Sequence, residues 1–114
     1  MLTEHELFAV FLGRAAHVAG NEMYFEPEVA IQFLAACEEN NLAVIGIEGF
    51  IFDDPALMPQ VDLIADYSAS GEKSWRSFRD SCNRDAAHFL QQLPQRQNLV
   101  LSLTVLSRKE WKKN

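Results

Sequence analysis

Apolar side chains recur at helical spacing in three stretches of the chain. Residues 3–19, 27–40 and 74–93 carry them at steps of three and four residues, the pattern of a helix with one apolar face. We expect Gly20 to close the first helix and Pro94 to end the third, because both residue types are common just past a helix. The pattern therefore predicts helices over these three ranges.

Three further stretches predict strands. Residues 42–52 form an almost wholly apolar run with β-branched and aromatic side chains, which is typical of a buried strand. Residues 61–68 alternate between apolar and polar positions, and residues 98–106 place apolar side chains at every odd position. Alternation indicates a strand with one buried face and one face in water. Residues 53–59, which contain two prolines, are predicted to be a loop.

The element order α-α-β-β-α-β predicts an α+β fold, in which helices pack on a small, mainly antiparallel three-stranded sheet. We expect the apolar stripe of the third helix to pack against the odd-numbered face of the last strand, namely Leu99, Leu101 and Leu103. A chain of 114 residues is long enough for one core, so residues 1–114 are predicted to form a single domain. The basic tail, residues 107–114, is predicted to fray.

Charge is unevenly distributed along the chain. Residues 1–66 hold twelve acidic side chains and one basic side chain, whereas residues 67–114 hold four acidic and nine basic ones. Such a field steers encounters with charged partners, and its acidic half opposes direct binding to nucleic acid phosphates. The alternative is that the two halves interleave in the folded protein and that their fields largely cancel.

Several classes of function find no support in the sequence. The two cysteines and three histidines match no zinc spacing, and Gly46-Ile-Glu-Gly49 lacks the spacing and the lysine of a phosphate-binding loop, so we expect no metal and no cofactor. No apolar run reaches the length of a membrane span, and the N-terminus carries acid where a secretory signal carries base. We therefore expect a cytoplasmic protein without membrane contact.

Glu48 is the one ionisable residue inside the apolar run 42–52, so it either faces solvent or is held there for a purpose. Paired with Asp62 or Asp66 on the next strand, it could form the two-carboxylate arrangement that glycosidases use. A hydrolase of that kind is one alternative. A small ligand-binding or regulatory protein-interaction module is another, and a concave pocket around Glu48 would favour either.

The most specific motif of the chain is Ile45-Gly-Ile-Glu-Gly49, which Ser68-Ala-Ser70 and Trp75 follow in that order. Together with Ala30-Ile31, Cys37-Glu38, Asn41-Leu42 and Asp66-Tyr67, this segment resembles the immunity protein of the anticodon-cleaving tRNase colicin of the E group. The resemblance covers about forty-five residues. The chain departs from that family in two ways. The first predicted helix is an addition, and residues 71–74 separate Ser68-Ala-Ser70 from Trp75, which are almost adjacent in the family.

This resemblance implies an inhibitor without enzymatic activity, part of a bacteriocin or toxin–antitoxin pair. Its partner would be a cognate toxin nuclease with a basic cleft. The inhibitor would present carboxylates in this cleft, at the positions that the phosphates of the tRNA substrate would occupy. A flat, acid-lined surface would favour this interpretation. The candidate phosphate mimics are Glu48, Asp53, Asp54, Asp62 and Asp66. Tyr67 and Trp75 could stack as bases do or anchor the interface, although their apolar register also suits the core.

Overall fold

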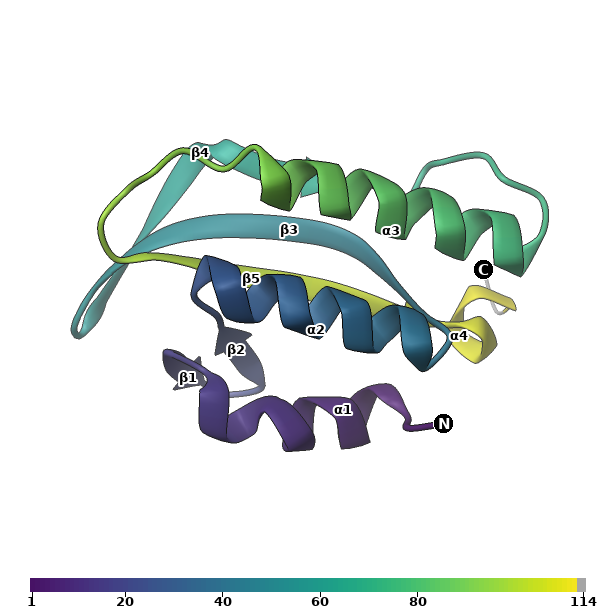
Figure 1. The fold of residues 1–114 in the computed structure, drawn as a ribbon, viewed down its shortest axis with the longest axis horizontal. Helices are drawn as coiled ribbons and strands as arrows, with labels where there is room; N and C mark the ends of the chain where they lie inside the picture. Colours follow the sequence, from purple (N-terminus) through teal and green to yellow (C-terminus); the bar gives the residue numbers. More distant parts are fainter. Residues whose placement is uncertain (113–114) are drawn as a thin grey trace.

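The computed structural model describes residues 1–112, and within them the chain forms the helices and strands that Figure 1 shows. In order, they are α1 (Glu4–Phe11), the short 3-10 helix η1 (Leu12–Arg14), β1 (His17–Ala19), β2 (Glu22–Tyr24), α2 (Pro27–Glu39), β3 (Leu42–Asp53), β4 (Ala56–Asp66), α3 (Trp75–Gln91), β5 (Leu99–Ser107) and α4 (Arg108–Lys112). This is an α+β fold, and the predicted class is confirmed.

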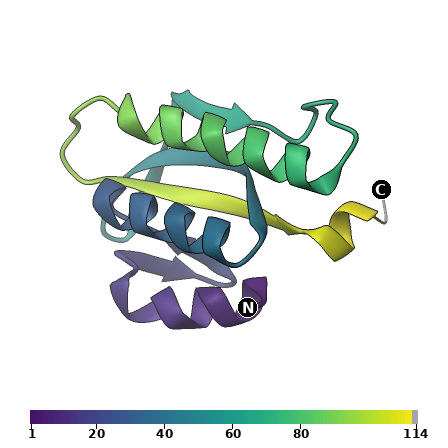
Figure 2. The ribbon, with the colours of Figure 1, turned by 45° about the vertical axis from the view of Figure 1, so that its right-hand side comes forward.

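The central sheet has the strand order β4-β3-β5, and both of its pairings are antiparallel. Figures 1 and 2 show α2 and α3 side by side in front of this sheet, so that both helices cover the same face. β1 and β2 form a separate hairpin, which joins the edge of β5 through a backbone pair between Phe25 and Leu101. The other face of the sheet carries no helix, and it is called the open face from here on.

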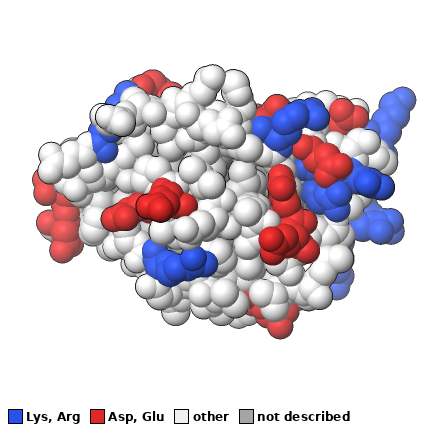
Figure 3. Space-filling model, in the orientation of Figure 1, with Lys and Arg blue, Asp and Glu red and all other residues white. Residues whose placement is uncertain are grey.

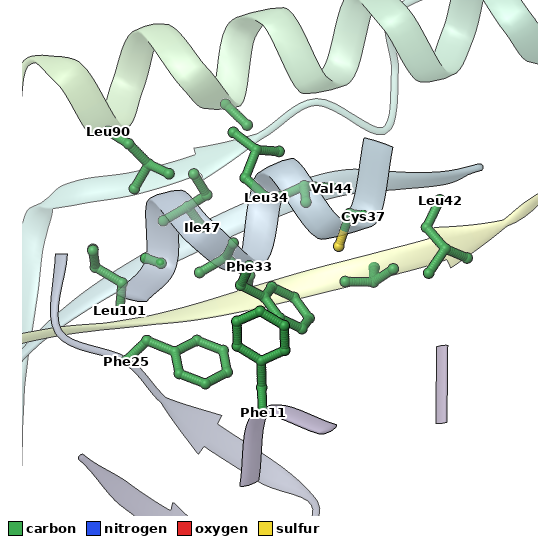
Figure 4. Close-up of a cluster of buried hydrophobic side chains, with 14 of the residues drawn as sticks. Phe11, Phe25, Phe33, Leu34, Cys37, Leu42, Val44, Ile47, Leu90 and Leu101 are labelled. Carbon is green, nitrogen blue, oxygen red and sulfur yellow. The ribbon is translucent and has the colours of Figure 1, made fainter. Parts of the chain in front are cut away.

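The core lies between the two helices and the sheet. It combines Val44 and Ile47 of β3 with Leu101 of β5 and with apolar side chains of α2 and α3 (Figure 4). Phe11, Phe25 and Phe33 point toward one another at the lower edge of this cluster, with ring centroids 5.0 to 6.1 Å apart. These rings attach α1 to α2 and to Phe25, which pairs with β5.

The burial of the odd-numbered face of β5 is confirmed, since Leu99, Leu101 and Leu103 are at most 5% exposed. The prediction that the third helix covers these three residues was wrong. α3 packs mainly over β3 and beside α2, whereas α2 packs on both β3 and β5, and α1 contacts β5. The reason is strand order: β3 lies in the centre of the sheet, so two adjacent helices cannot both lie over an edge strand.

The first predicted helix, 3–19, is too long. α1 ends at Phe11, and residues 17–24 form the β1–β2 hairpin. Gly20, expected to close the helix, lies in the two-residue turn of that hairpin with a φ of 61°. A positive φ is what such a turn demands, and glycine adopts it without a steric penalty.

The second predicted strand is too short. β4 begins at Ala56 instead of residue 61, and the predicted loop 53–59 is a tight turn at Asp54-Pro55, whose peptide bond is cis. The β3–β4 pairing then shifts between Glu48 and Phe50, where β4 bulges away from β3. This bulge leaves Val61 84% exposed, although its alternation pattern predicted a buried position.

Residues 108–112, expected to fray, form α4. Ser107 and Glu110 cap this helix reciprocally through their side chains and backbone N–H groups, and Trp111 packs against Trp75 and Phe78. The remainder of the predicted tail, residues 113–114, lies outside the described residues.

Candidate interaction surface

Glu48 lies on the open face of the central sheet. Its neighbour Ile47 points into the core, so alternation turns Glu48 to the opposite side, where its side chain is exposed. Directly across from it are Ile64 of β4 and Ser102 of β5. Residues that face each other across an antiparallel pair have their side chains on the same face, so these three define the centre of the surface.

A small depression, of about 240 Å³, lies beside Glu48, over Gly46 and next to Asp66 and Thr104. Gly46 provides this space because it has no side chain: a Cβ atom there would lie 3.3 Å from the backbone oxygen of Ala65. Pockets for small molecules usually measure about 300–1,000 Å³, so this depression is smaller than a typical ligand site.

The β1–β2 hairpin brings a second carboxylate to this surface. The Ser102 hydroxyl donates a hydrogen bond to Glu22 Oε2 over 2.7 Å, which places Glu22 beside the residue that faces Glu48. Tyr24 packs edge-on against Phe50, with ring centroids 5.3 Å apart. Burial raises the pKa of Tyr24, and the charges of Glu22 and Glu48 raise it further.

Sequence analysis missed Glu22 and Tyr24 as members of the surface. Both precede Glu48 by more than twenty positions, and the sequence pattern predicts a helix up to residue 19 and no strand before residue 42. The signal that could have found them is Gly20-Asn21 between two short alternating segments, which is typical of a two-residue hairpin turn.

Asp66, at the end of β4, shares the open face with Glu48, because Gly46 pairs with Asp66 two residues before Glu48. Its carboxylate accepts hydrogen bonds from the backbone N–H and the hydroxyl of Ser68, at 2.8 and 2.6 Å. These bonds lower the pKa of Asp66 and hold the side chain in place. Asp66 is therefore an ionised and oriented member of the surface.

The other predicted acids are placed differently. Arg96 donates two hydrogen bonds to Asp62 and one to Gln60, and this pairing lowers the pKa of Asp62, so a cation of the same chain already compensates its charge. Asp53 and Asp54 are exposed at the tip of the β3–β4 hairpin. Asp53 lies five positions after Glu48 along β3, a distance of roughly 17 Å.

Tyr67 and Trp75 lie on the helix side of the sheet. The Tyr67 hydroxyl donates to the backbone oxygen of Asp85 in α3 over 3.4 Å. Trp75 is 7% exposed, and its indole N–H donates to Asn41 Oδ1 over 2.8 Å. Both aromatic side chains pack with the core, as the alternative interpretation expected, so neither shares a surface with Glu48.

The acids of the open face have no cationic partner among residues 1–112. Within those residues the ion pairs are Arg79–Asp80 and Arg96–Asp62, and neither involves Glu22, Glu48 or Asp66. On the helix-covered face, by contrast, Figure 3 shows acidic and basic groups close together, with basic groups gathered toward the end where α4 lies. The charges of the two halves therefore interleave on that face, while the open face keeps three uncompensated carboxylates.

Comparison with known proteins does not identify a family for this chain. No protein-family model matches it, and no curated protein matches it significantly. In the part of the chain that the structure describes, no three His, Cys, Asp or Glu side chains gather in a way that could hold a metal ion. Over the same residues, no helix has both the length and the apolar character needed to cross a membrane.

Proposed function

We propose that this protein is a bacterial immunity protein that binds a toxin ribonuclease in the cytoplasm and inhibits it. It has no catalytic activity of its own. Its open face occupies the active site of the nuclease with an acidic, nucleic-acid-mimicking surface. The observation that carries this proposal is that three carboxylates, Glu22, Glu48 and Asp66, have no cationic partner among residues 1–112, on a surface whose depression beside Glu48 measures only about 240 Å³.

The geometry suits a cationic cleft. Glu48 and Asp66 lie on adjacent strands and two residues out of register, so their Cα atoms are separated by roughly 8 Å. Ile64, 55% exposed, lies directly across from Glu48 and offers apolar contact between the acids. An apolar centre bordered by charged groups is the usual composition of a specific protein interface, and complementary charge speeds the encounter.

The acids have two roles in this proposal. Asp53 and Asp54, exposed at the hairpin tip, act at the rim and raise the association rate, and salt screens their effect. Glu48 and Asp66 act at the centre, because strand positions hold their side chains more rigidly. Removing a central acid leaves a buried cation of the nuclease without a partner, which costs on the order of 2–5 kcal/mol.

A hydrolase that uses Glu48 is supported less well. Of its two candidate partner carboxylates, Asp62 is paired with Arg96 and Asp66 is held by Ser68. The depression beside Glu48 is also too small to enclose a sugar or a comparable substrate. The same small volume argues against a ligand-binding module centred on Glu48.

The test is a kinetic one, with the nuclease domain encoded beside the gene for this chain. Association and dissociation rates are measured for the parent, for Glu48→Gln, and for Asp53→Asn combined with Asp54→Asn. We expect the first variant to dissociate about thirtyfold to several thousandfold faster, the range that corresponds to 2–5 kcal/mol. The double variant should associate more slowly at low salt and like the parent at high salt.

The matched control is Glu38→Gln combined with Glu39→Gln, because both residues are exposed at the end of α2 on the helix-covered side. It removes two charges, as the rim variant does, and should leave dissociation unchanged. The proposed function fails if no nuclease is bound, or if Glu48→Gln binds like the parent at low salt.

A further inference from the structure

A groove of about 880 Å³ lies away from the open face, and it shares no lining residue with the depression beside Glu48. Its walls come from α1, the turn of the β1–β2 hairpin, the α2–β3 turn and the junction of β5 with α4. Figures 1 and 2 show α1 and the hairpin on the side of β5 that lies away from α3, and residues of both line this groove. Its volume falls within the range of small-molecule sites.

The lining of this groove is mainly apolar. Its apolar side chains include Leu2, Phe8, Leu12, Val18, Met23 and Leu42. Two of them, Leu12 and Val18, are 52% and 42% exposed, so the groove presents apolar surface to water. Such surface is removed from water at a gain when an apolar chain fills it.

Cationic side chains line one end. Arg108 and Lys109 belong to the groove wall, are exposed, and form no ion pair with any residue between 1 and 112. Glu4 lies at the same end. Partial burial, followed by the charge and hydrogen bonding of Glu110, raises the pKa of Glu4 to about 7, so near neutral pH Glu4 opposes an anion only in part.

We propose that this groove binds a small amphipathic anion, a medium-chain carboxylate or a molecule of equivalent chemistry. The acyl chain lies between α1 and the hairpin, and the carboxylate lies against Arg108 and Lys109. Arg108 and Lys109, which form no ion pair within residues 1–112, select an anion over a cation, and the volume suits a single small molecule. This activity is separate from nuclease inhibition, since it uses a different part of the surface.

The probe is decanoate, kept below its micelle concentration, and binding to the full chain is measured by isothermal titration calorimetry at pH 6.5. We expect saturable binding of one molecule per chain. Octanoate, shorter by two methylene groups, should bind up to about fifteenfold more weakly, the ratio equivalent to about 0.8 kcal/mol per buried methylene. Decylammonium should not bind, and decanol should bind more weakly than decanoate.

Two variants test the placement. Arg108→Gln combined with Lys109→Gln should weaken decanoate binding at least tenfold, while Val18→Glu, which sets a carboxylate into the apolar wall, should abolish it. The matched control for the double variant is Arg76→Gln combined with Arg84→Gln, two exposed positions on α3, which should change affinity less than twofold. Circular dichroism of each variant establishes that it is folded.

Three results would overturn the proposal. They are the absence of saturable decanoate binding, equal affinity for decylammonium, and an equal loss of binding in the α3 control variant. Amide chemical shifts of the parent give an independent readout, because decanoate should perturb Val18, Met23 and Leu42. Perturbations confined to other residues would contradict the assignment of the groove.

Discussion

Asn83 is the one buried polar residue of the described core, and its removal gives the sharpest test of how β3 is held. Its side chain is 1% exposed and extends from α3 to the backbone of β3. Asn83 Oδ1 accepts from the N–H of Val44 over 2.8 Å, and Asn83 Nδ2 donates to the carbonyl of Leu42 over 3.0 Å. β4 pairs with β3 only from Gly46 onward, so Asn83 takes the place of a strand along the first three residues of β3.

The expected cost follows from these two bonds. Asn83→Ala leaves a buried N–H and a buried carbonyl without partners, at about 1–3 kcal/mol for each group. The smaller side chain adds a cavity, so we expect a total loss of about 2–5 kcal/mol, a large part of the 5–15 kcal/mol that is typical for a domain. The free energy of unfolding is measured by urea denaturation followed by circular dichroism, and hydrogen exchange at the Val44 amide should accelerate.

Arg84→Ala is the matched control, because Arg84 is the next residue of α3 and is exposed. It should change the free energy of unfolding by less than about 0.5 kcal/mol. The reasoning about Asn83 is refuted if both variants unfold at the same urea concentration, or if the Val44 amide keeps the exchange rate that it has in the parent.

Two further predictions concern packing and pH. Gly49→Ala should lower the free energy of unfolding by about 1–3 kcal/mol, because its Cβ atom would lie 2.8 Å from the Cβ atom of Leu63. Thermal melts should show a smaller effect of this change in a Leu63→Gly background, which has no Cβ atom at that position. Glu4, whose pKa is raised from 4.5 to about 7, favours the folded state fully below pH 4.5 and loses that contribution as the pH rises through 7. As the pH rises from 5 to 8, the free energy of unfolding of Glu4→Gln should therefore increase by about 1–2 kcal/mol relative to that of the parent. This value is reduced from about 3.4 kcal/mol because the Glu4 side chain is half exposed. Equal pH profiles of the two proteins in urea titrations would contradict the prediction.

The candidate surface was predictable only in part. Glu48 stands out in the sequence because an acid inside an apolar strand must turn to the wet side. Whether another acidic side chain is free to bind a partner on this surface depends on its neighbours in space. Asp62 pairs with Arg96, which lies 34 positions later, and Glu22 reaches the open face because a hairpin places it on Ser102, 80 positions away. No local pattern contains these contacts.

The sequence by itself determined α2, β3, α3 and β5, because each has an unbroken apolar periodicity that one backbone conformation satisfies. It did not determine the hairpin after α1, where residues 15–18 also fit a helical stripe, nor the start of β4, where Pro55 and Pro59 suggested a loop. Tertiary structure decided these segments. Phe25 pairs with Leu101 in β5, and β3 supplies the hydrogen bonds that a proline-containing edge strand lacks on its own. The tertiary structure also decided that α3 lies over β3. Strand order depends on pairing between distant segments and not on the apolar periodicity of any single segment.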